Sequence, residues 1–460
     1  MPSRSPLLRS RQETGLPARL TRSAARAARG VQMATAEVGA WLAERRSAHH
    51  FCVHRIPFDR LEKWSFEEGT GNLVHRSGRF FTVEGLHVTE VEGPFPDWQQ
   101  PVINQPEVGI LGILVKEFDG VLHFLMQAKM EPGNPNLLQL SPTVQATRSN
   151  YTKAHRGADV KYLEYFTRPG RGRMHVDVLQ SEHGAWFVRK ANRNMLVETT
   201  DEVPPDNDFC WLTLGQLGRL LREDNVVNMD ARTVLGCLPS ADSETVALHS
   251  DTELLSWITA ERARHEVYTR RIPLAEVEGW HQDAYSVHRA DGRYFSVVAV
   301  AVEAGNREVT GWTQPLFEPH GLGVIAFLTR RIEGVPHLLV HARVEGGFLD
   351  TIELAPTVQC VPQNYPRPGD CPKFLDLVLA AGSDRIRYEA RHSEEGGRFL
   401  NAQSRTLIVE ADEEQAPLEP PSGYRWVTPA QLSTLTRHAH YVNVQARTLL
   451  ACLHSGAAHC

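Results

Sequence analysis

The chain carries one long polar motif twice. The first copy occupies Leu140–Tyr151 and reads LSPTVQATRSNY; the second occupies Leu354–Tyr365, 214 positions later, and reads LAPTVQCVPQNY. Further matched segments keep an offset between 212 and 216: Arg55–Pro57 with Arg271–Pro273, Gly78–Phe81 with Gly292–Phe295, Trp98–Pro101 with Trp312–Pro315, and Ala231–Thr233 with Ala446–Thr448. Solenoid repeats are far shorter than this. The spacing therefore predicts two homologous halves of ordinary domain size.

The length of 460 residues suits two or three domains. The repeat places one domain at residues 34–240 and the other at 250–455, with the boundary in a Ser- and Asp-containing segment between them. The first 33 residues are rich in Arg and hold one acid, Glu13. We expect them to form a disordered tail, and Met33 is a plausible alternative start.

Composition narrows the possible partners. The net charge is −6 with a pI near 6.4, so the chain has no basic footprint and nucleic acid is not an expected partner. The seven cysteines form no CxxC pair and their number is odd, which argues against a disulfide scaffold and a cysteine zinc site. No apolar run approaches the roughly 20 residues that a membrane span needs. We expect the protein to lie in a reducing cytoplasm. We expect no membrane partner.

Each half shows the same order of predicted elements, which gives an α+β fold class. A helix opens each half, with Thr35 and Asp251 as the expected caps, and two helices close it. Between them we expect strands, including a hairpin directly before each copy of the motif. The hairpins are Val108–Met130, turning at Asp119-Gly120, and Gly323–Arg343, turning at Glu333-Gly334. After the motif, Tyr162–Phe166 and Phe374–Val378 are expected to be strands.

The motif at Ser141–Tyr151, with its degenerate copy at 355–365, resembles the NDP-hexose 2,3-dehydratases of deoxysugar pathways in antibiotic-producing bacteria. The resemblance runs from about Ala34 to Leu453 and includes the duplication. It implies two Nudix-like modules, each a mixed β-sheet with flanking helices, with nucleotide-sugar pockets in both and a homodimeric chain. It also implies that dTDP-4-keto-6-deoxy-D-glucose loses its 2-hydroxyl as water, and that a downstream 3-ketoreductase acts on the 3,4-diketo-2,6-dideoxy product.

The chemistry that the resemblance implies needs three groups. The C4 ketone acidifies the C3 proton, so a base must take that proton, donors must hold the oxyanion, and an acid must protonate the departing hydroxide. Neither a redox cofactor nor a metal is required, and the sequence has no dinucleotide fingerprint, HExxH or P-loop. The carboxylate helix of Nudix hydrolases is also missing, since its nearest fragment, Arg222-Glu223-Asp224, lacks the following glutamate pair.

The two copies divide the candidate residues, because features present twice suit the fold or nucleotide binding and features present once suit catalysis. The first copy alone has Ser141 and Arg148, where the second has Ala355 and Pro362, so we expect the working site in the first half and a degenerate pocket in the second. The catalytic candidates are Tyr151, His155 and Glu164, with Glu131 as a further titratable group. The substrate-binding candidates are Trp98, Ser141, Thr143, Gln145, Arg148, Asn150, Lys161 and Arg193. The second-pocket candidates are Trp312, Thr357, Gln359, Asn364, Tyr365, Lys373 and Arg405.

Each candidate has an alternative. His155 also fits an exposed loop histidine, and Glu164 a solvent-facing strand residue paired with Lys161. Because Tyr365 repeats Tyr151, the alternative role for Tyr151 is stacking on the nucleotide base or packing in the core. Arg148 and Arg193 are predicted to bind diphosphate but also fit salt bridges, and Trp98 and Trp312 fit core packing as well as stacking. At the level of the whole chain, the alternatives are a non-catalytic nucleotide-sugar-binding protein and a nucleotide-sugar hydrolase.

Overall fold

The computed structural model describes residues 15–91, 96–147, 160–240, 245–305 and 310–460. Each half contains a seven-stranded sheet with one parallel and several antiparallel pairs, so the fold is mixed α and β. The first sheet has the order β10-β11-β6-β7-β12, with β8 on β7 and β9 on β6, and the second has β20-β19-β18-β23-β22, with β24 and β21 on β19 and β18.

The strands of the first of these sheets are β6 (Ile110–Phe118), β7 (Val121–Met130), β8 (Leu138–Ser141), β9 (Val144–Ala146), β10 (Arg173–Ser181), β11 (Ala191–Glu198) and β12 (Phe209–Thr213). Those of the second are β18 (Gly323–Ile332), β19 (Val335–Val344), β20 (Ile352–Ala355), β21 (Val358–Cys360), β22 (Ile386–Ser393), β23 (Gln403–Glu410) and β24 (Tyr424–Val427). The hairpins β6–β7 and β18–β19 confirm both predicted hairpins and their turns.

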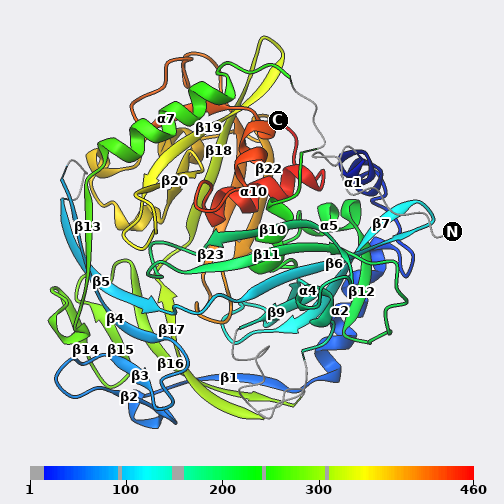
Figure 1. Ribbon diagram of the computed structural model, residues 1–460. Coiled ribbons are helices and arrows are strands. Elements are labelled where there is room, and N and C mark those ends of the chain that lie inside the picture. The colour runs from blue at the N-terminus through cyan, green and yellow to red at the C-terminus, as the bar shows by residue number, and fades with distance from the viewer. Residues whose placement is uncertain (1–14, 92–95, 148–159, 241–244, 306–309) are drawn as a thin grey trace.

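Two five-stranded sheets exchange strands between the halves. One holds β2 (Trp64–Phe66), β3 (Leu73–His75), β4 (Thr82–Glu90) and β5 (Asp97–Asn104) of the first half together with β13 (Val267–Ile272) of the second. The other holds β14 (Trp280–Gln282), β15 (Ser286–Arg289), β16 (Phe295–Ala304) and β17 (Gly311–Pro319) together with β1 (Phe51–Ile56) of the first half. Each half thus gives its first strand to the sheet of the other half (Figure 1).

The closing helices of both halves share one core. They are α5 (Leu214–Leu220) and α6 (Met229–Gly236) in the first half and α9 (Pro429–Leu435) and α10 (Val444–His454) in the second. α6 packs against α10, and a single buried apolar cluster includes Val234 and Leu235 together with Leu449 and Leu450. A Cβ on Gly236 would lie 2.3 Å from the Arg447 carbonyl oxygen, so this glycine permits the close approach of the two helices.

The remaining helices correct several expectations. They are α1 (Leu16–Ala24), α2 (Thr35–Ala48), α4 (Glu164–Thr167), α7 (Asp251–Arg264) and α8 (Leu375–Leu379), with 3-10 turns η1 (Phe58–Arg60), η2 (Leu274–Glu276), η3 (Pro362–Asn364) and η4 (Pro368–Asp370). The predicted strands at Tyr162–Phe166 and Phe374–Val378 are wrong: Tyr162 and Phe374 have φ of 61° and 68°, and α4 and α8 follow them. A short apolar run fits a buried helix turn as well as a strand.

The predicted helix caps shift by one residue. Ser250, rather than Asp251, caps α7: its hydroxyl accepts the Glu253 N–H (3.3 Å), and the Glu253 carboxylate accepts the Ser250 N–H (2.7 Å). Ala34, rather than Thr35, precedes α2, and the Glu37 carboxylate accepts its N–H (2.6 Å). In both cases an acid three residues into the helix satisfies a backbone donor, as in a capping box.

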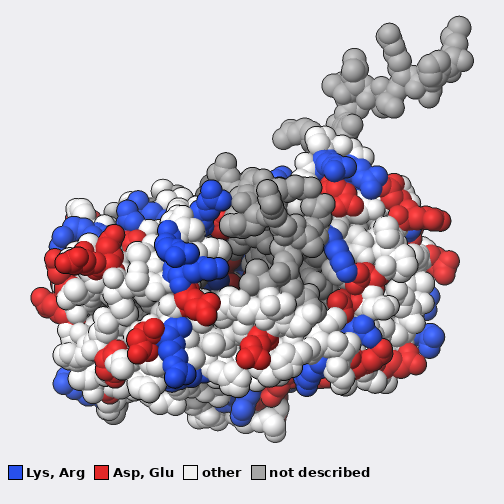
Figure 2. Space-filling model, turned by 90° about the horizontal axis from the view of Figure 1, so that it is seen from below, with Lys and Arg blue, Asp and Glu red and all other residues white. Residues whose placement is uncertain are grey.

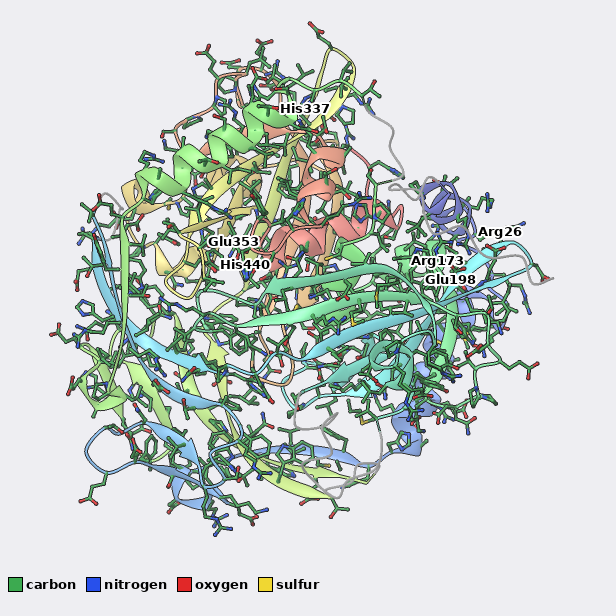
Figure 3. All side chains as sticks on the ribbon, viewed as in Figure 1. Arg26, Arg173, Glu198, His337, Glu353 and His440 are labelled. Atoms are coloured by element: carbon green, nitrogen blue, oxygen red, sulfur yellow. The ribbon has the colours of Figure 1, made fainter. Side chains whose placement is uncertain are left out.

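Part of the expected disordered tail is folded in the structure. α1 buries Leu16 and Leu20, one helical turn apart, and Ser23 donates to the Leu122 carbonyl (2.6 Å). Arg19 of α1 also donates to the Glu198 carboxylate (2.9 Å), which lies beside Arg173 at the end of the first sheet (Figure 3). This segment can pack although it is rich in Arg, because α1 is amphipathic: Leu16 and Leu20 lie on its buried face and the arginines on its other faces.

Basic and acidic side chains are interspersed over the face shown in Figure 2. Over the described ranges, no helix has the length and apolar character needed to cross a membrane.

Candidate active site

A cavity of about 200 Å³ lies where the first half meets a loop of the second. Its first-half wall includes Lys129, Glu131, Gln145, Lys190, Asn192 and Asp230, and its second-half wall includes Trp312, Gln314, Glu395 and Arg398. The loop after β22 is held in place by backbone bonds: Gly133 N–H donates to the Gly396 carbonyl (2.7 Å), and Asn401 N–H donates to the Gly133 carbonyl (2.8 Å). A Cβ on Gly133 would lie 1.8 Å from the Phe399 carbonyl, so a larger residue would push the loop away.

The repeated motif positions Glu131 at the end of β7. The Glu131 carboxylate accepts from Lys129 Nζ (3.1 Å) and from the side-chain amide of Gln145 (2.8 Å) through the same oxygen, Oε1. Ser141, which is fully buried, donates from its hydroxyl to Gln145 Oε1 (3.0 Å). Ser141 and Gln145 are therefore brought together, and through them the motif orients a carboxylate on the cavity wall.

Lys190 brings a buried ammonium group to the same cavity. Its Nζ donates to Asn192 Oδ1 (2.8 Å) and to the Glu107 carbonyl, and Asn192 in turn donates to Glu182 Oε1 (2.6 Å). Burial lowers the pKa of Lys190, against the opposing charge of Glu182. The hydrogen bonds that Lys190 donates to Asn192 and to the Glu107 carbonyl fix the position of its charge.

Asp230 and Glu395 face the cavity from opposite halves. Asp230 lies in the first turn of α6 and is 3% exposed, and burial together with the charge of Glu395 raises its pKa well above the usual range. Burial raises the pKa of Glu395 to about 7; Arg398 opposes this rise, and Glu182 and Glu131 add to it. Because several carboxyl groups share this space, the repulsion between their negative charges favours the neutral form of one of them.

Arg398 and Trp312 complete the second-half wall. Arg398 donates from Nε to Gln105 Oε1 (3.0 Å), and its guanidinium lies 4.3 Å from the centroid of the Phe81 ring. Trp312 donates from Nε1 to Gln314 Oε1 (2.8 Å) and remains half-buried. The cavity thus offers a planar cation and an aromatic ring, which suit a phosphate and a nucleoside base.

The equivalent place in the second half keeps the scaffold but lacks four of the charged groups. Glu345 accepts from Arg343 (2.8 Å) and Gln359 (2.9 Å), as Glu131 does from Lys129 and Gln145. The four other charged groups of the first cavity, Lys190, Asp230, Glu395 and Arg398, align with Ala402, Gln445, His183 and Trp186. The charged set therefore occurs once in the chain.

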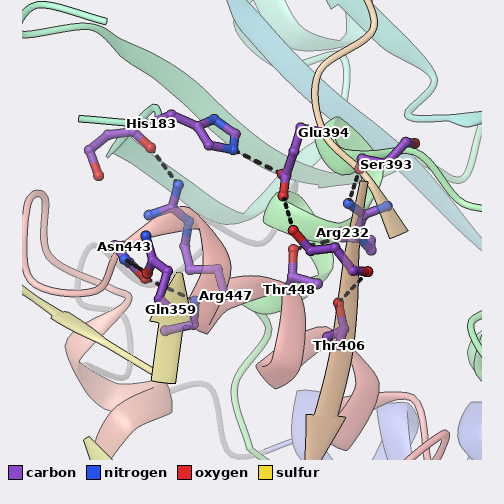
Figure 4. Close-up of polar contacts among 12 residues, drawn as sticks. His183, Arg232, Gln359, Ser393, Glu394, Thr406, Asn443, Arg447 and Thr448 are labelled. Carbon is purple, nitrogen blue, oxygen red and sulfur yellow. Dashed lines mark hydrogen bonds and ion pairs between the residues drawn. The ribbon is translucent and has the colours of Figure 1, made fainter. Parts of the chain in front are cut away.

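A buried network ties the two places together (Figure 4). Arg232 of α6 donates to the Ser393 carbonyl (2.5 Å) in the second half, and Arg447 of α10 donates to the Ser181 carbonyl (2.6 Å) in the first. His183 is paired with Glu394 (2.9 Å), the residue directly before Glu395. The loop that carries Glu395 is thus held by buried polar contacts from both halves.

A family model described as NDP-hexose 2,3-dehydratase matches residues 35–238 and again 251–453. The chain belongs to this family. A relative from Amycolatopsis orientalis is 65% identical over 436 residues, covering 93% of this chain and 92% of the relative. A relative from Saccharopolyspora spinosa is 54% identical, covering 92% and 91%, and one from Streptomyces violaceoruber is 49% identical, covering 91% and 97%. All three are named dTDP-4-dehydro-6-deoxy-alpha-D-glucopyranose 2,3-dehydratases.

Several residues predicted to bind substrate in this family member make structural contacts. The Thr143 hydroxyl accepts the Leu114 N–H (2.8 Å) and donates to the Leu125 carbonyl (2.5 Å), so it joins β6 to β7 inside the sheet. Thr357 makes the equivalent contacts in the second half. Arg193 is paired with Asp177 (2.5 Å), Arg405 with Glu389 (2.6 Å), and Lys161 with Asp206.

The remaining candidates are dispersed. Trp98 packs beside Val88 and Val102, Glu164 is half-buried on α4, and Lys373 is exposed. Asn364 accepts the Tyr294 N–H through Oδ1 (3.0 Å), and burial raises the pKa of Tyr365. Arg148, Asn150, Tyr151 and His155 lie outside the described residues.

Trp312 lies in a different place from the one expected. It was predicted for the second pocket, but it lines the first cavity, because the sheet containing β17 extends across to the first half through the exchanged strand β1.

Sequence reasoning missed Lys190, Asp230, Glu395 and Arg398. Each is a charged residue whose aligned position in the other half is not an equivalent charge. Extending the comparison of the copies beyond the motif could have found all four. Nothing in the sequence, however, shows that Glu395 and Arg398 serve the cavity of the first half. Over the residues described, no cluster of His, Cys, Asp and Glu has the arrangement of a metal site.

Proposed function

We propose that this chain removes the 2-hydroxyl of dTDP-4-keto-6-deoxy-D-glucose as water, giving the 3,4-diketo-2,6-dideoxy sugar nucleotide. The names of relatives up to 65% identical support the substrate and the reaction. The single structural observation that supports it best is the cavity that collects Lys190, Asp230, Glu395 and Arg398, none of which has an equivalent charge in the other half.

The reaction needs a carboxyl pair of the kind this cavity holds. Removal of the C3 proton gives an enolate on C3, C4 and the C4 oxygen. Its electron pair then expels the C2 hydroxyl, which leaves as water once it is protonated, and the enol that remains tautomerises to the diketone. One carboxyl group must accept a proton and another must give one. Asp230 and Glu395 are the proposed proton-transfer groups.

The cations of the cavity serve the negative charges of the substrate. In the proposed arrangement, Lys190 holds the oxyanion that develops on the C4 oxygen, because its ammonium is fixed by Asn192 and shielded from water. Arg398 binds the diphosphate, and Trp312 offers a face to the thymine ring. Thr147 lines the cavity, and Arg148, Asn150, Tyr151 and His155 follow it in the chain and stay proposed as substrate-contacting or catalytic residues.

The wider setting is proposed from the family resemblance. The two halves are taken as tandem Nudix-like modules, spanning 34–240 and 250–455, in a chain that forms a homodimer in the cytoplasm. Its product is passed to a 3-ketoreductase in deoxysugar biosynthesis for antibiotics. The duplicated mixed sheets support the tandem modules, and the net charge of −6 supports a small-molecule partner over nucleic acid.

Incubation with substrate labelled with ¹⁸O at C2 tests the proposed function. We expect the label to appear in water and the sugar nucleotide to lose the mass of one water molecule. Binding of the substrate without release of label would show a binding protein instead. Release of a nucleoside monophosphate would show a hydrolase.

A further inference from the structure

Asp230 and Glu395, two of the three carboxyl groups that line the cavity, differ in their surroundings. Asp230 is 3% exposed and makes no hydrogen bond through its side chain within the described part of the chain. Its charged neighbours are mainly the carboxyl groups of Glu395, Glu131 and Glu182, with Lys129 as the weaker opposing charge. Burial and neighbouring negative charges both favour the neutral form of a carboxyl group.

Glu395 has cations beside it. Arg398 lies three residues further along the same loop, and Lys190, the residue directly before the first-half strand β11, lines the same cavity. Glu395, which lines the cavity, is half-buried, whereas Asp230 is buried. The charges of Arg398 and Lys190 favour the carboxylate form of Glu395 relative to that of Asp230.

We propose that Glu395, supplied by the second half, is the base that takes the C3 proton, and that Asp230 is the acid that protonates the departing C2 hydroxyl. This assignment rests on the proposed function. The C3 proton moves to the Glu395 carboxylate while its electron pair enters the enolate. The C2–oxygen bond then breaks, the hydroxyl takes the Asp230 proton and leaves as water, and C2 and C3 become doubly bonded.

The pair is restored by a net proton transfer. After one turnover Glu395 has gained the proton that Asp230 has lost, so transfer from the first carboxyl to the second returns both to their starting forms. No external oxidant, reductant or co-reactant is needed. Opposed environments for two acids in one site are the usual basis for separate acid and base roles.

The second half shows what the site looks like without this pair. Gln445 stands at the position of Asp230 and His183 at that of Glu395, and His183 is committed to an ion pair with Glu394. The scaffold around Glu345, Arg343 and Gln359 persists there. The acid–base pair is therefore separable from the scaffold, and it needs one residue from each half.

Solvent exchange distinguishes the two roles in the full-length chain. In deuterated water, Asp230→Asn should still exchange the C3 hydrogen of the substrate, while release of the C2 oxygen falls by about 100-fold or more. Glu395→Gln should lose both exchange and release. Loss of exchange in Asp230→Asn, or its survival in Glu395→Gln, would overturn the assignment.

A fluorinated substrate gives a second, independent test. Fluoride leaves without needing a proton, so the analogue with fluorine in place of the C2 hydroxyl should restore elimination by Asp230→Asn and should not restore it by Glu395→Gln. Failure to rescue Asp230→Asn would show that it is not the acid. If wild-type protein releases no C2 oxygen, the proposed function fails instead, whatever the variants do.

Two controls separate a structural effect from the chemical one. Glu394→Gln removes another buried carboxylate from the same loop, and we expect it to lower the melting temperature without changing the ratio of exchange to release. If Asp230→Asn does not fold, Asp230→Gln copies the residue found at the equivalent position of the second half. A changed ratio in Glu394→Gln would show that the ratio reports on the loop and not on the acid–base pair.

Discussion

Burial and the charges of four residues together set the pH at which the carboxyl group of Glu395 can accept a proton. Arg398 and Lys190 favour its charged form, and Glu182 and Glu131 oppose it. With burial, the result is a pKa raised to about 7. A base with that pKa is charged above pH 7 and is progressively neutralised as the pH falls.

The pH profile of kcat/KM, which reports the ionisation of the free enzyme, should therefore rise through a limb near pH 7. Arg398→Met removes a positive charge beside Glu395, so the limb should move to higher pH. Glu182→Gln removes a negative charge, so the limb should move to lower pH. Profiles of both variants that superimpose on the wild-type profile would show that the limb belongs to another group.

At the scale of elements, the α6–α10 contact depends on a helical glycine. Gly236→Ala would place a methyl group 2.3 Å from the Arg447 carbonyl, so we expect a loss of about 1–3 kcal/mol in the free energy of unfolding. Gly39→Ala is the matched control, because no atom lies within 4 Å of the added Cβ in α2. It should stabilise the protein by about 0.5–1 kcal/mol. Chemical denaturation measures both changes, and equal signs would contradict the packing account.

The stability that the docking of α1 provides should depend on pH. Burial opposes ionisation of Glu198, but hydrogen bonds from Arg19 and His175 outweigh it and lower its pKa to about 2. The ordinary value is 4.5, so the carboxylate stabilises the fold above pH 4.5, and this contribution is lost as the pH falls towards 2.

The melting temperature of Glu198→Gln should consequently lie below that of the wild type at pH 7. The difference should shrink when both proteins are melted between pH 4.5 and pH 3. A gap that stays constant across this range would show that the charge of Glu198 does not anchor the helix.

At the scale of the whole molecule, the exchanged strands make the halves interdependent. β1 completes the sheet of the second half and β13 that of the first, and unpaired edges would be exposed if the halves were separated. We expect fragments cut in the 245–250 segment to co-purify when expressed together and to be poorly soluble when expressed alone. A soluble, cooperatively melting first half on its own would contradict this.

Much of this architecture could be predicted from the sequence. The duplication and the hairpins at Asp119-Gly120 and Glu333-Gly334 followed from matched text and turn chemistry, because these are local signals. The aromatic runs around Tyr165 and Phe374 were misassigned, since burial alone does not distinguish a short helix from a strand. The strand exchange could not be predicted either, because a β-strand sequence does not specify which of two homologous sheets it joins.

Only the part of the site that is encoded by a contiguous motif could be predicted from the sequence. Ser141 and Gln145 were found because the motif is contiguous, and both converge on Glu131. Glu395 and Arg398 lie more than two hundred residues away and reach the cavity only through the packing of one half on the other. A comparison of the two copies position by position would place Glu395 and Arg398 in the pocket of the second half, whereas they line the cavity of the first.

Release of the C2 oxygen from ¹⁸O-labelled substrate tests the claim that the chain has one working cavity built by both halves. Glu395→Gln should reduce release by about 100-fold or more, although the residue belongs to the second half. Glu345→Gln, which alters the equivalent of Glu131 in the place without the charged set, should leave release within about a factor of ten, the scale of a 1.4 kcal/mol effect. Equal losses in the two variants, or undiminished release by Glu395→Gln, would contradict the account.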